Sequence, residues 1–174
     1  MVTLKGKSIY LRALEPEDLQ FLYELENNPA VWEISGTITP YSRHVLKKYL
    51  DNAHRDIFEV KQLRLSICSN EDKVIGLIDL FDYNPVHKRA GVGIIIQAED
   101  KRNQGLGTEA TRLLLDYAFS ALDLRQVFAN VNEDNVASIH LFKKLGFIET
   151  GLKKDWIRSG VKYKNEILFQ KINS

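Results

Sequence analysis

The sequence has only one cysteine and almost no imbalance of charge, with 24 basic and 23 acidic residues and a formal net charge of +1. Because a lone Cys68 cannot form an internal disulfide, a reducing compartment is expected. Nucleic-acid binding relies on clustered cationic surface, so the balanced charge gives no reason to expect a nucleic acid as partner. It gives none for a membrane surface either.

Long apolar runs are also missing. Residues 1–14 alternate apolar and polar side chains around Lys5, Lys7 and Arg12, and contain no apolar block of signal-peptide length. We therefore expect a cytoplasmic protein. The sequence has no internal repeat and no low-complexity linker, and its length suits one domain with a real core. The expected organisation is a single domain over residues 1–174.

The first half of the chain predicts a strand, two helices and a hairpin. Residues 7–14 are rich in strand formers, and a helix follows Pro16 and ends at Asn27-Asn28-Pro29. Residues 30–41 show no period and are interpreted as a long loop, after which Ser42 caps a helix to about residue 52. Two strands, residues 62–68 and 74–81, are separated by a polar five-residue link typical of a hairpin.

The most informative stretch begins with a strand over residues 88–96. A polar turn then carries Gly105 and Gly107 into an amphipathic helix that ends near residue 122. Bare backbone N–H groups at such a helix start can face an anion, so the turn predicts a pyrophosphate cradle. The remaining elements expected are a strand at 127–131, a helix at 135–145 ended by Gly146, and strands at 147–157 and 162–170.

Two familiar phosphate-binding motifs do not fit this stretch. Residues 105–110 satisfy G-x-G-x-x-A, but eight residues, 97–104, separate the strand from Gly105, whereas the dinucleotide motif follows its strand almost at once. Too little chain remains after Gly107 for the further βα units of such a fold. Gly-Lys-Ser occurs at Gly6-Lys7-Ser8, outside this stretch, and Met1 stands where a nucleoside-triphosphate P-loop needs its first glycine, so that motif is not complete. The two glycines alone are equally compatible with a simple connecting turn.

The whole segment resembles the acetyl-CoA loop of the GNAT acyltransferase superfamily, because Arg102-x-x-Gly105-x-Gly107 lies between a strand and a helix. Residues 135–147, which start Asn-Val-Ala-Ser and end Leu-Gly-Phe, resemble the second cofactor segment of that superfamily. Within it, the chain looks most similar to the branch of spermidine N-acetyltransferases and ribosomal-protein alanine N-acetyltransferases. The resemblance implies an α+β fold in three layers: a central mixed, mostly antiparallel sheet splayed at its middle strands, with helices on both faces.

The resemblance also implies acetyl-CoA as co-substrate, and no metal. The backbone of Ile94, Ile95 and Ile96 would bond the pantetheine amides and polarise the thioester carbonyl, which is stabilisation of an oxyanion by fixed donors. The resemblance would bring Lys144 to a CoA phosphate, and a solvated lysine on an exposed helix face is the commoner role for such a residue. The other residues implied to contact the cofactor are Arg102, Asn103, Gln104, Gly105, Leu106, Gly107, Thr108, Asn135 and Phe142.

The chemistry implied is direct attack of a primary amine on the thioester in a ternary complex, which needs a base for the amine and an acid for the leaving thiolate. Many relatives carry a tyrosine acid where this chain has Phe142, and the spermidine enzymes carry a glutamate where it has Gly91. Ser138 is the next candidate acid, with a purely structural helix-start role equally open. Asp79 and Asp82 are the candidate bases, although either acid could simply be solvated.

The acceptor is predicted to be a small amine or a protein N-terminus, with Trp32 and Glu33 as candidate substrate contacts. A polyamine or diamine ranks below these, because a cationic substrate requires several carboxylates and residues 32–40 supply only Glu33. Two rivals remain: a CoA-binding module without turnover, suggested by Gly91 and Phe142, and a nicotinamide-dependent enzyme. A homodimer is compatible with the sequence, and the oligomeric state is left open.

Overall fold

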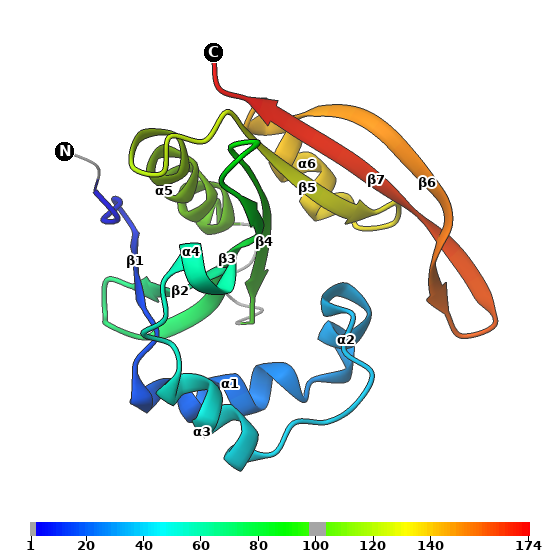
Figure 1. The fold of residues 1–174 in the computed structure, drawn as a ribbon. Helices are drawn as coiled ribbons and strands as arrows, with labels where there is room; N and C mark the ends of the chain where they lie inside the picture. Colours follow the sequence, from blue (N-terminus) through cyan, green and yellow to red (C-terminus); the bar gives the residue numbers. More distant parts are fainter. Residues whose placement is uncertain (1–2, 98–103) are drawn as a thin grey trace.

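The computed structural model describes residues 3–97 and 104–174 (Figure 1). In this part of the chain, seven strands form one sheet in the order β1-β2-β3-β4-β5-β7-β6. The β4–β5 pair is parallel and every other neighbouring pair is antiparallel, which confirms the predicted mixed, mostly antiparallel sheet. The strands are β1 (Ile9–Ala13), β2 (Leu63–Ser69), β3 (Val74–Asn84), β4 (Arg89–Ile96), β5 (Gln126–Asn132), β6 (Ile148–Ser159) and β7 (Lys162–Ile172).

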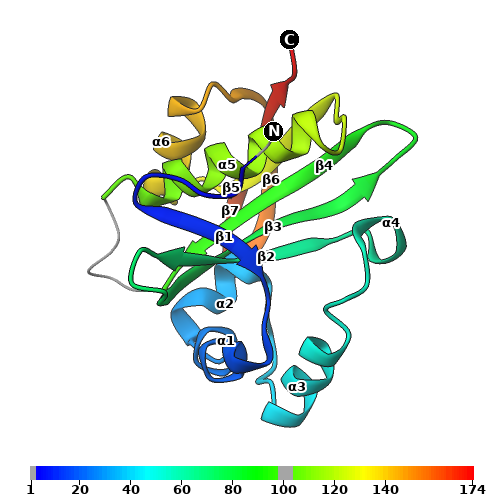
Figure 2. The same ribbon diagram turned by 90° about the vertical axis from the view of Figure 1, so that its left-hand side faces the viewer.

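Helices cover both faces of the sheet, as expected. Figure 2 shows α5 and α6 on one face, and α1, α2 and α3 on the other. The helices are the 3-10 helix η1 (Pro16–Asp18), α1 (Leu19–Glu26), α2 (Pro29–Ser35), α3 (Arg43–Asp51), α4 (Ile57–Val60), α5 (Leu106–Ser120) and α6 (Val136–Lys144). Ser42 caps α3 as predicted, because its side chain accepts a hydrogen bond from the Val45 N–H.

Each face of the sheet has its own apolar core. On one side, α5 and α6 pack against the sheet around Leu114, Phe142 and Phe169. On the other, a smaller cluster joins α1, α2 and α3 to β3, through Leu22, Leu25, Val31, Leu46 and Leu77. All five residues of this smaller cluster also line the cavity described below.

The prediction of a long loop over residues 30–41 is wrong, because α2 occupies its first half. Asn28 and Pro29 end the preceding helix, but they also start the next one. The Asn28 side chain accepts a hydrogen bond from the Ala30 N–H, and Pro29 takes the first helical position, where its missing N–H costs nothing. Gly36, at φ +72°, ends α2 in the left-handed conformation.

The sheet opens between β4 and β5. Their pairing covers only Arg89–Gly91 of β4, although β4 continues to Ile96 along β3. The Gln97 N–H donates to the Ile75 carbonyl on β3. Because backbone groups alternate between the two edges of an antiparallel strand, the N–H and C=O of Ile94 are directed away from β3, into the opening. This confirms the predicted splay at the middle strands.

Candidate active site

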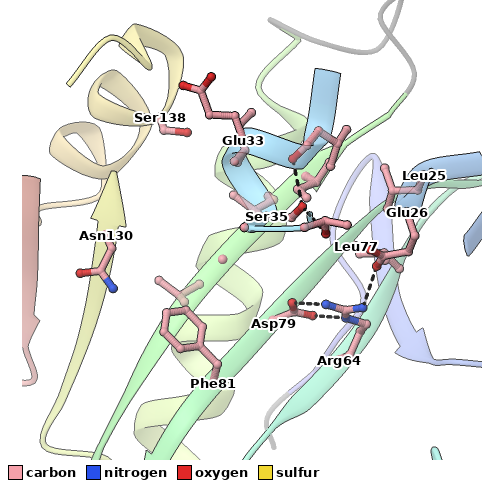
Figure 3. A pocket seen from close by; sticks show the side chains of 18 of the residues that line it. Leu25, Glu26, Glu33, Ser35, Arg64, Leu77, Asp79, Phe81, Asn130 and Ser138 are labelled. Carbon is pink, nitrogen blue, oxygen red and sulfur yellow. Dashed lines mark hydrogen bonds and ion pairs between the residues drawn. The ribbon is translucent and has the colours of Figure 1, made fainter. Parts of the chain in front are cut away.

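A cavity of about 590 Å³ lies at this opening, between the sheet and helices α1 to α3. Figure 3 shows it with Ser138 and Asn130 on one side and Arg64, Asp79 and Glu26 on the other. Its lining includes Leu25, Glu26, Glu33, Ser35 and Tyr49 from the helices, Arg64, Leu77, Asp79, Phe81, Gly93, Ile94, Ile95, Asn130, Asn132 and Glu166 from the sheet, and Asn135, Ser138 and Phe142 around α6.

Main-chain groups face the opening from both sides. On β4 they belong to Ile94, as the register above shows. On β5, the Glu133 N–H donates to Asn165 on β7, so by the same alternation the backbone groups of Asn130 and Asn132 are directed toward β4. An extended, amide-containing molecule can therefore lie in the gap and bond to both strands.

The glycine turn leads to the same opening. Gly105 takes a left-handed φ of +76° at the N-cap of α5, a conformation that a side chain disfavours. Gly107 allows close packing, since a Cβ there would lie 3.1 Å from Leu141 Cδ1 and 3.6 Å from Ile94 Cδ1. The first turn of α5 thus sits directly against β4 and α6, and its N–H groups are directed out of the helix start, where an anion can bind.

A second hollow of about 400 Å³ lies beside this helix start. Gly105, Thr108 and Lys144 line it, which brings together three of the residues predicted to hold CoA phosphates. Two further cations, Lys7 and Arg112, line the same hollow, together with the acids Glu109 and Asp116. A cationic hollow at a helix N-terminus suits a phosphate.

Helix α6 brings its predicted residues to the cavity. The Asn135 side chain caps α6 by accepting a hydrogen bond from the Ser138 N–H at 3.2 Å. Ser138 and Asn135 are half-buried and line the cavity. Phe142 is buried one turn further along, in an edge-to-face contact with Phe147 and a stacked contact with Phe169. Phe142 therefore contributes an apolar wall that has no proton to give.

Asp79 is bound by Arg64, which was not predicted from the sequence to be a site residue. Arg64 donates to both of its carboxylate oxygens, at 2.8 and 2.9 Å, and to Glu26 at 3.2 Å (Figure 3). Burial opposes the charge on Arg64, but the hydrogen bonds from its guanidinium to Asp79 outweigh it and raise the pKa of Arg64 above its usual range. Both oxygens of Asp79 are occupied, which leaves it poorly placed to act as a base.

Of the two candidate acceptor contacts, Glu33 lines the cavity and Trp32 does not. Glu33 accepts hydrogen bonds from Lys164 at 2.5 Å and Ser159 at 3.0 Å, and these bonds hold its pKa below its ordinary value. This contact ties α2 to the β6–β7 hairpin. The Trp32 indole N–H donates to the Glu26 carbonyl, a packing role within the helical layer.

The other predicted residues lie around the cavity or outside the description. Asp82 is exposed at an irregularity of the β3–β4 ladder, with a φ of +49°, and does not line the cavity. Ile96 packs against the larger core and Leu106 starts α5. Gln104 directly precedes the Gly105 cap, and Arg102 and Asn103 lie outside the described residues.

Three charged residues that line the cavity were not predicted from the sequence: Glu26, Arg64 and Glu166. Each reaches the site only through the fold: Arg64 lies opposite Asp79 in the β2–β3 ladder, and Glu166 lies opposite Asn132 in the β5–β7 ladder. Alternation along β2 and β7 places these side chains on the cavity face. Only the register of the sheet identifies Arg64 and Glu166, and Glu26 reaches the cavity from the end of α1.

No helix in the described ranges 3–97 and 104–174 is long and apolar enough to cross a bilayer. Over the same ranges, no group of three or more histidine, cysteine, aspartate and glutamate side chains is placed to hold a metal ion.

Comparisons with known proteins agree with this geometry. The family described as acetyltransferase (GNAT) domain matches residues 8–148. Spermidine N(1)-acetyltransferase of Escherichia coli strain K12 is 35% identical over 161 residues, which cover 92% of this chain and 83% of the relative.

Solved structures give the same picture. Spermidine N-acetyltransferase from Vibrio cholerae, in complex with CoA and spermine, superposes with a TM-score of 0.86 at 25% identity, covering 96% of both chains. A dodecameric structure of the Vibrio cholerae enzyme in an intermediate state gives a TM-score of 0.79 at 28% identity, covering 96% of this chain and 95% of that one. The chain therefore belongs to the GNAT acetyltransferases and is an acyltransferase that uses acetyl-CoA.

Proposed function

We propose that the protein transfers the acetyl group of acetyl-CoA to the primary amine of a small molecule by direct attack in a ternary complex. One observation carries this proposal: a single cavity joins the open edge of β4, at Gly93 and Ile94, to a chamber lined by the carboxylates of Glu26, Glu33, Asp79 and Glu166. A thioester and a cationic amine can therefore meet in one enclosed space.

The donor end is suited to acetyl-CoA. Its pantetheine arm would bond to the backbone groups of Ile94 and Asn130 in the gap, with Asn135 and the Phe142 ring beside it. Its phosphates would lie before α5, near Thr108 and Lys144. The Ile94 N–H would stabilise the oxyanion that forms on attack, a contribution of about 3 kcal/mol for one such donor.

The acceptor end supports a small amine more than a protein N-terminus. The α2 helix covers the cavity, tied to the β6–β7 hairpin through the Glu33–Lys164 contact, so a folded chain has limited access. The leaving thiolate requires a proton, and Ser138 is the hydroxyl of α6 that lines the cavity. We propose Ser138 as its donor.

A polyamine is the second candidate acceptor. Spermidine acetyltransferases are similar to this chain over most of its length. The fold also brings four carboxylates to the cavity, whereas residues 32–40 contain only one of them, Glu33. Each of these carboxylates is also paired with a basic side chain, Arg64, Lys164 or Lys153. This pairing weakens the negative electrostatic potential that would attract a polycation, so a polyamine ranks below a smaller amine as the acceptor.

Release of free thiol from acetyl-CoA in the presence of single amines tests the proposal. The panel contains monoamines, diamines, spermidine, spermine and a peptide with a free N-terminus. Turnover with a small amine is expected, and preference for the peptide would overturn the acceptor class. Tight acetyl-CoA binding without thiol release for any amine would instead support the non-catalytic CoA-binding module.

Three broader expectations accompany this function. We propose that residues 1–174 act as one catalytic domain, and that the protein works in the cytoplasm, in keeping with its single, buried, unpaired Cys68. We also propose self-association, since the Vibrio cholerae relative is dodecameric in a solved structure. Light scattering coupled to size-exclusion chromatography measures the mass of the assembly directly.

A further inference from the structure

We propose that Glu166 is the catalytic base that takes a proton from the acceptor amine. This inference rests on the proposed acetyl transfer. An acceptor amine arrives as an ammonium near neutral pH, and its nitrogen has no lone pair for attack until one proton leaves. The base must present a carboxylate oxygen to the cavity, close to the open edges of β4 and β5.

The other acids near the cavity do not meet this requirement. Both oxygens of Asp79 accept from Arg64, and both oxygens of Glu33 are taken by Lys164 and Ser159. Asp82 does not line the cavity.

Glu26 lines the cavity at its far side. Figure 3 shows it beside Arg64, across the view from Asn130 and Ser138. It shares the Arg64 guanidinium with Asp79, so it is better placed to contact the remote part of an acceptor than its reacting nitrogen.

Glu166 lies one strand away from the opening. It pairs with Asn132 of β5, whose backbone faces the gap, and Glu166 as a whole residue is 9% exposed and lines the cavity. Its Oε1 accepts a hydrogen bond from Lys153 at 2.9 Å. Its Oε2 accepts none from any residue that the structure describes, so this oxygen is available to a molecule in the cavity.

Lys153 holds this carboxylate in place. It lies opposite Glu166 on β6, donates also to Asn130 at 3.3 Å, and stands 4.9 Å from the centre of the Trp156 ring. The other charges facing Glu166 are Lys164, two residues away on β7, with its partners Glu33 on α2 and Asp134 before α6. Lys153 is thus a positioning residue for the Glu166 carboxylate.

The proton balance is simple. Glu166 takes one proton from the ammonium, and the amine nitrogen then forms a bond to the thioester carbon. When the carbon–sulfur bond breaks, the second proton of the nitrogen passes to the thiolate, by way of Ser138 or directly. The products are the amide and the free thiol, and the protonated Glu166 returns its proton to water.

The test is the pH dependence of kcat/KM for E166Q, K153M and the control E149Q, each with the best amine of the panel. E166Q is expected to lose about 100-fold or more in kcat/KM and to lose the acidic limb of the profile, while acetyl-CoA still raises its melting temperature. Glu149 is exposed on β6, so E149Q should match the wild type.

K153M removes the donor that holds Oε1 of Glu166, so kcat/KM should fall about tenfold or more, while acetyl-CoA still raises the melting temperature and K153R restores part of the rate. This variant decides the question if E166Q does not fold. A wild-type kcat/KM for K153M, or a wild-type rate for E166Q, overturns the role of Glu166. Absence of thiol release by the wild-type enzyme with every amine would instead refute the proposed function itself.

Discussion

The ring of Phe81 lies over Gly91, so that a Cβ added to Gly91 would stand 2.3 Å from Phe81 Cζ. The two residues face each other across the β3–β4 ladder, and Phe81 is also in edge-to-face contact with Phe128. The place beside Gly91 is therefore filled by an aromatic ring. A side chain at this position, including the glutamate of the spermidine enzymes, would have to displace that ring.

Gly91→Ala is expected to destabilise the protein by about 1–3 kcal/mol, the usual range for forcing extra atoms into a packed region. Urea denaturation measures this change. Gly93→Ala is the matched control, because its Cβ would lie 3.9 Å from Phe81, an ordinary contact. Equal stabilities for the two variants would contradict the role given to Phe81, and Phe81→Leu should restore part of the stability of Gly91→Ala.

Gly107→Val should weaken acetyl-CoA binding about tenfold, a loss of about 1.4 kcal/mol. The added side chain must push the first turn of α5 away from Leu141 and Ile94, and with it the N–H groups that we propose bind the CoA phosphates. Isothermal titration calorimetry gives the dissociation constant. Gly151→Ala, whose Cβ would meet nothing closer than 3.8 Å, should bind as the wild type does. Unchanged affinity in Gly107→Val would rule out close packing as the reason for this glycine.

Ser138→Ala is expected to lower kcat about 100-fold while acetyl-CoA affinity changes by less than about twofold, because a proton donor acts on the chemical step. Steady-state kinetics and calorimetry on the same preparation separate the two effects. Ser120→Ala, at the exposed end of α5, serves as control. If the rate is unchanged, Ser138 has only its structural place at the start of α6.

Asp18→Asn should cost about 3 kcal/mol at neutral pH, as expected when one partner of a buried ion pair is removed. Asp18 is 3% exposed and accepts hydrogen bonds from both terminal nitrogens of Arg12, from the Glu15 N–H and from Ser66. Burial opposes its charge, but the bonds from Arg12 and Glu15 prevail and hold the pKa of Asp18 below its ordinary 3.8.

A lowered pKa in the folded state means that the stabilisation is present above the unfolded-state value and is lost as the pH falls through the folded-state value. The difference in unfolding free energy between wild type and Asp18→Asn should therefore stay constant down to about pH 4 and shrink below pH 3.8. Urea titrations at several pH values measure it, with exposed Asp51→Asn as control. A difference that grows in acid would refute this assignment.

Features with a local cause were predictable from the sequence. Gly105 adopts a left-handed φ at the N-cap of α5, and the Ser42 side chain caps α3 through a bond to the nearby Val45 N–H. The α2 helix was missed because Asn28 and Pro29 serve equally as the end of one helix and the start of the next. Composition alone does not separate these two roles.

Features that depend on strand register were not predictable. Asp79 looked like a free acid at a strand end, and it loses that role only because β2 places Arg64 opposite it. Glu166 is 28 residues beyond Ser138 in sequence, and reaches the same cavity through the pairing of β7 with β5. A single change of register would place either side chain on the other face of the sheet.

The opening between β4 and β5 also bears on how this protein can change over evolutionary time. Its proposed donor end is built from main-chain groups such as the Ile94 N–H, which no substitution by another residue except proline removes. Its proposed acceptor end is built from side chains on separate elements, among them Glu33, Arg64 and Phe81. Mutation can therefore alter the amine that is accepted while the thioester site is inherited unchanged.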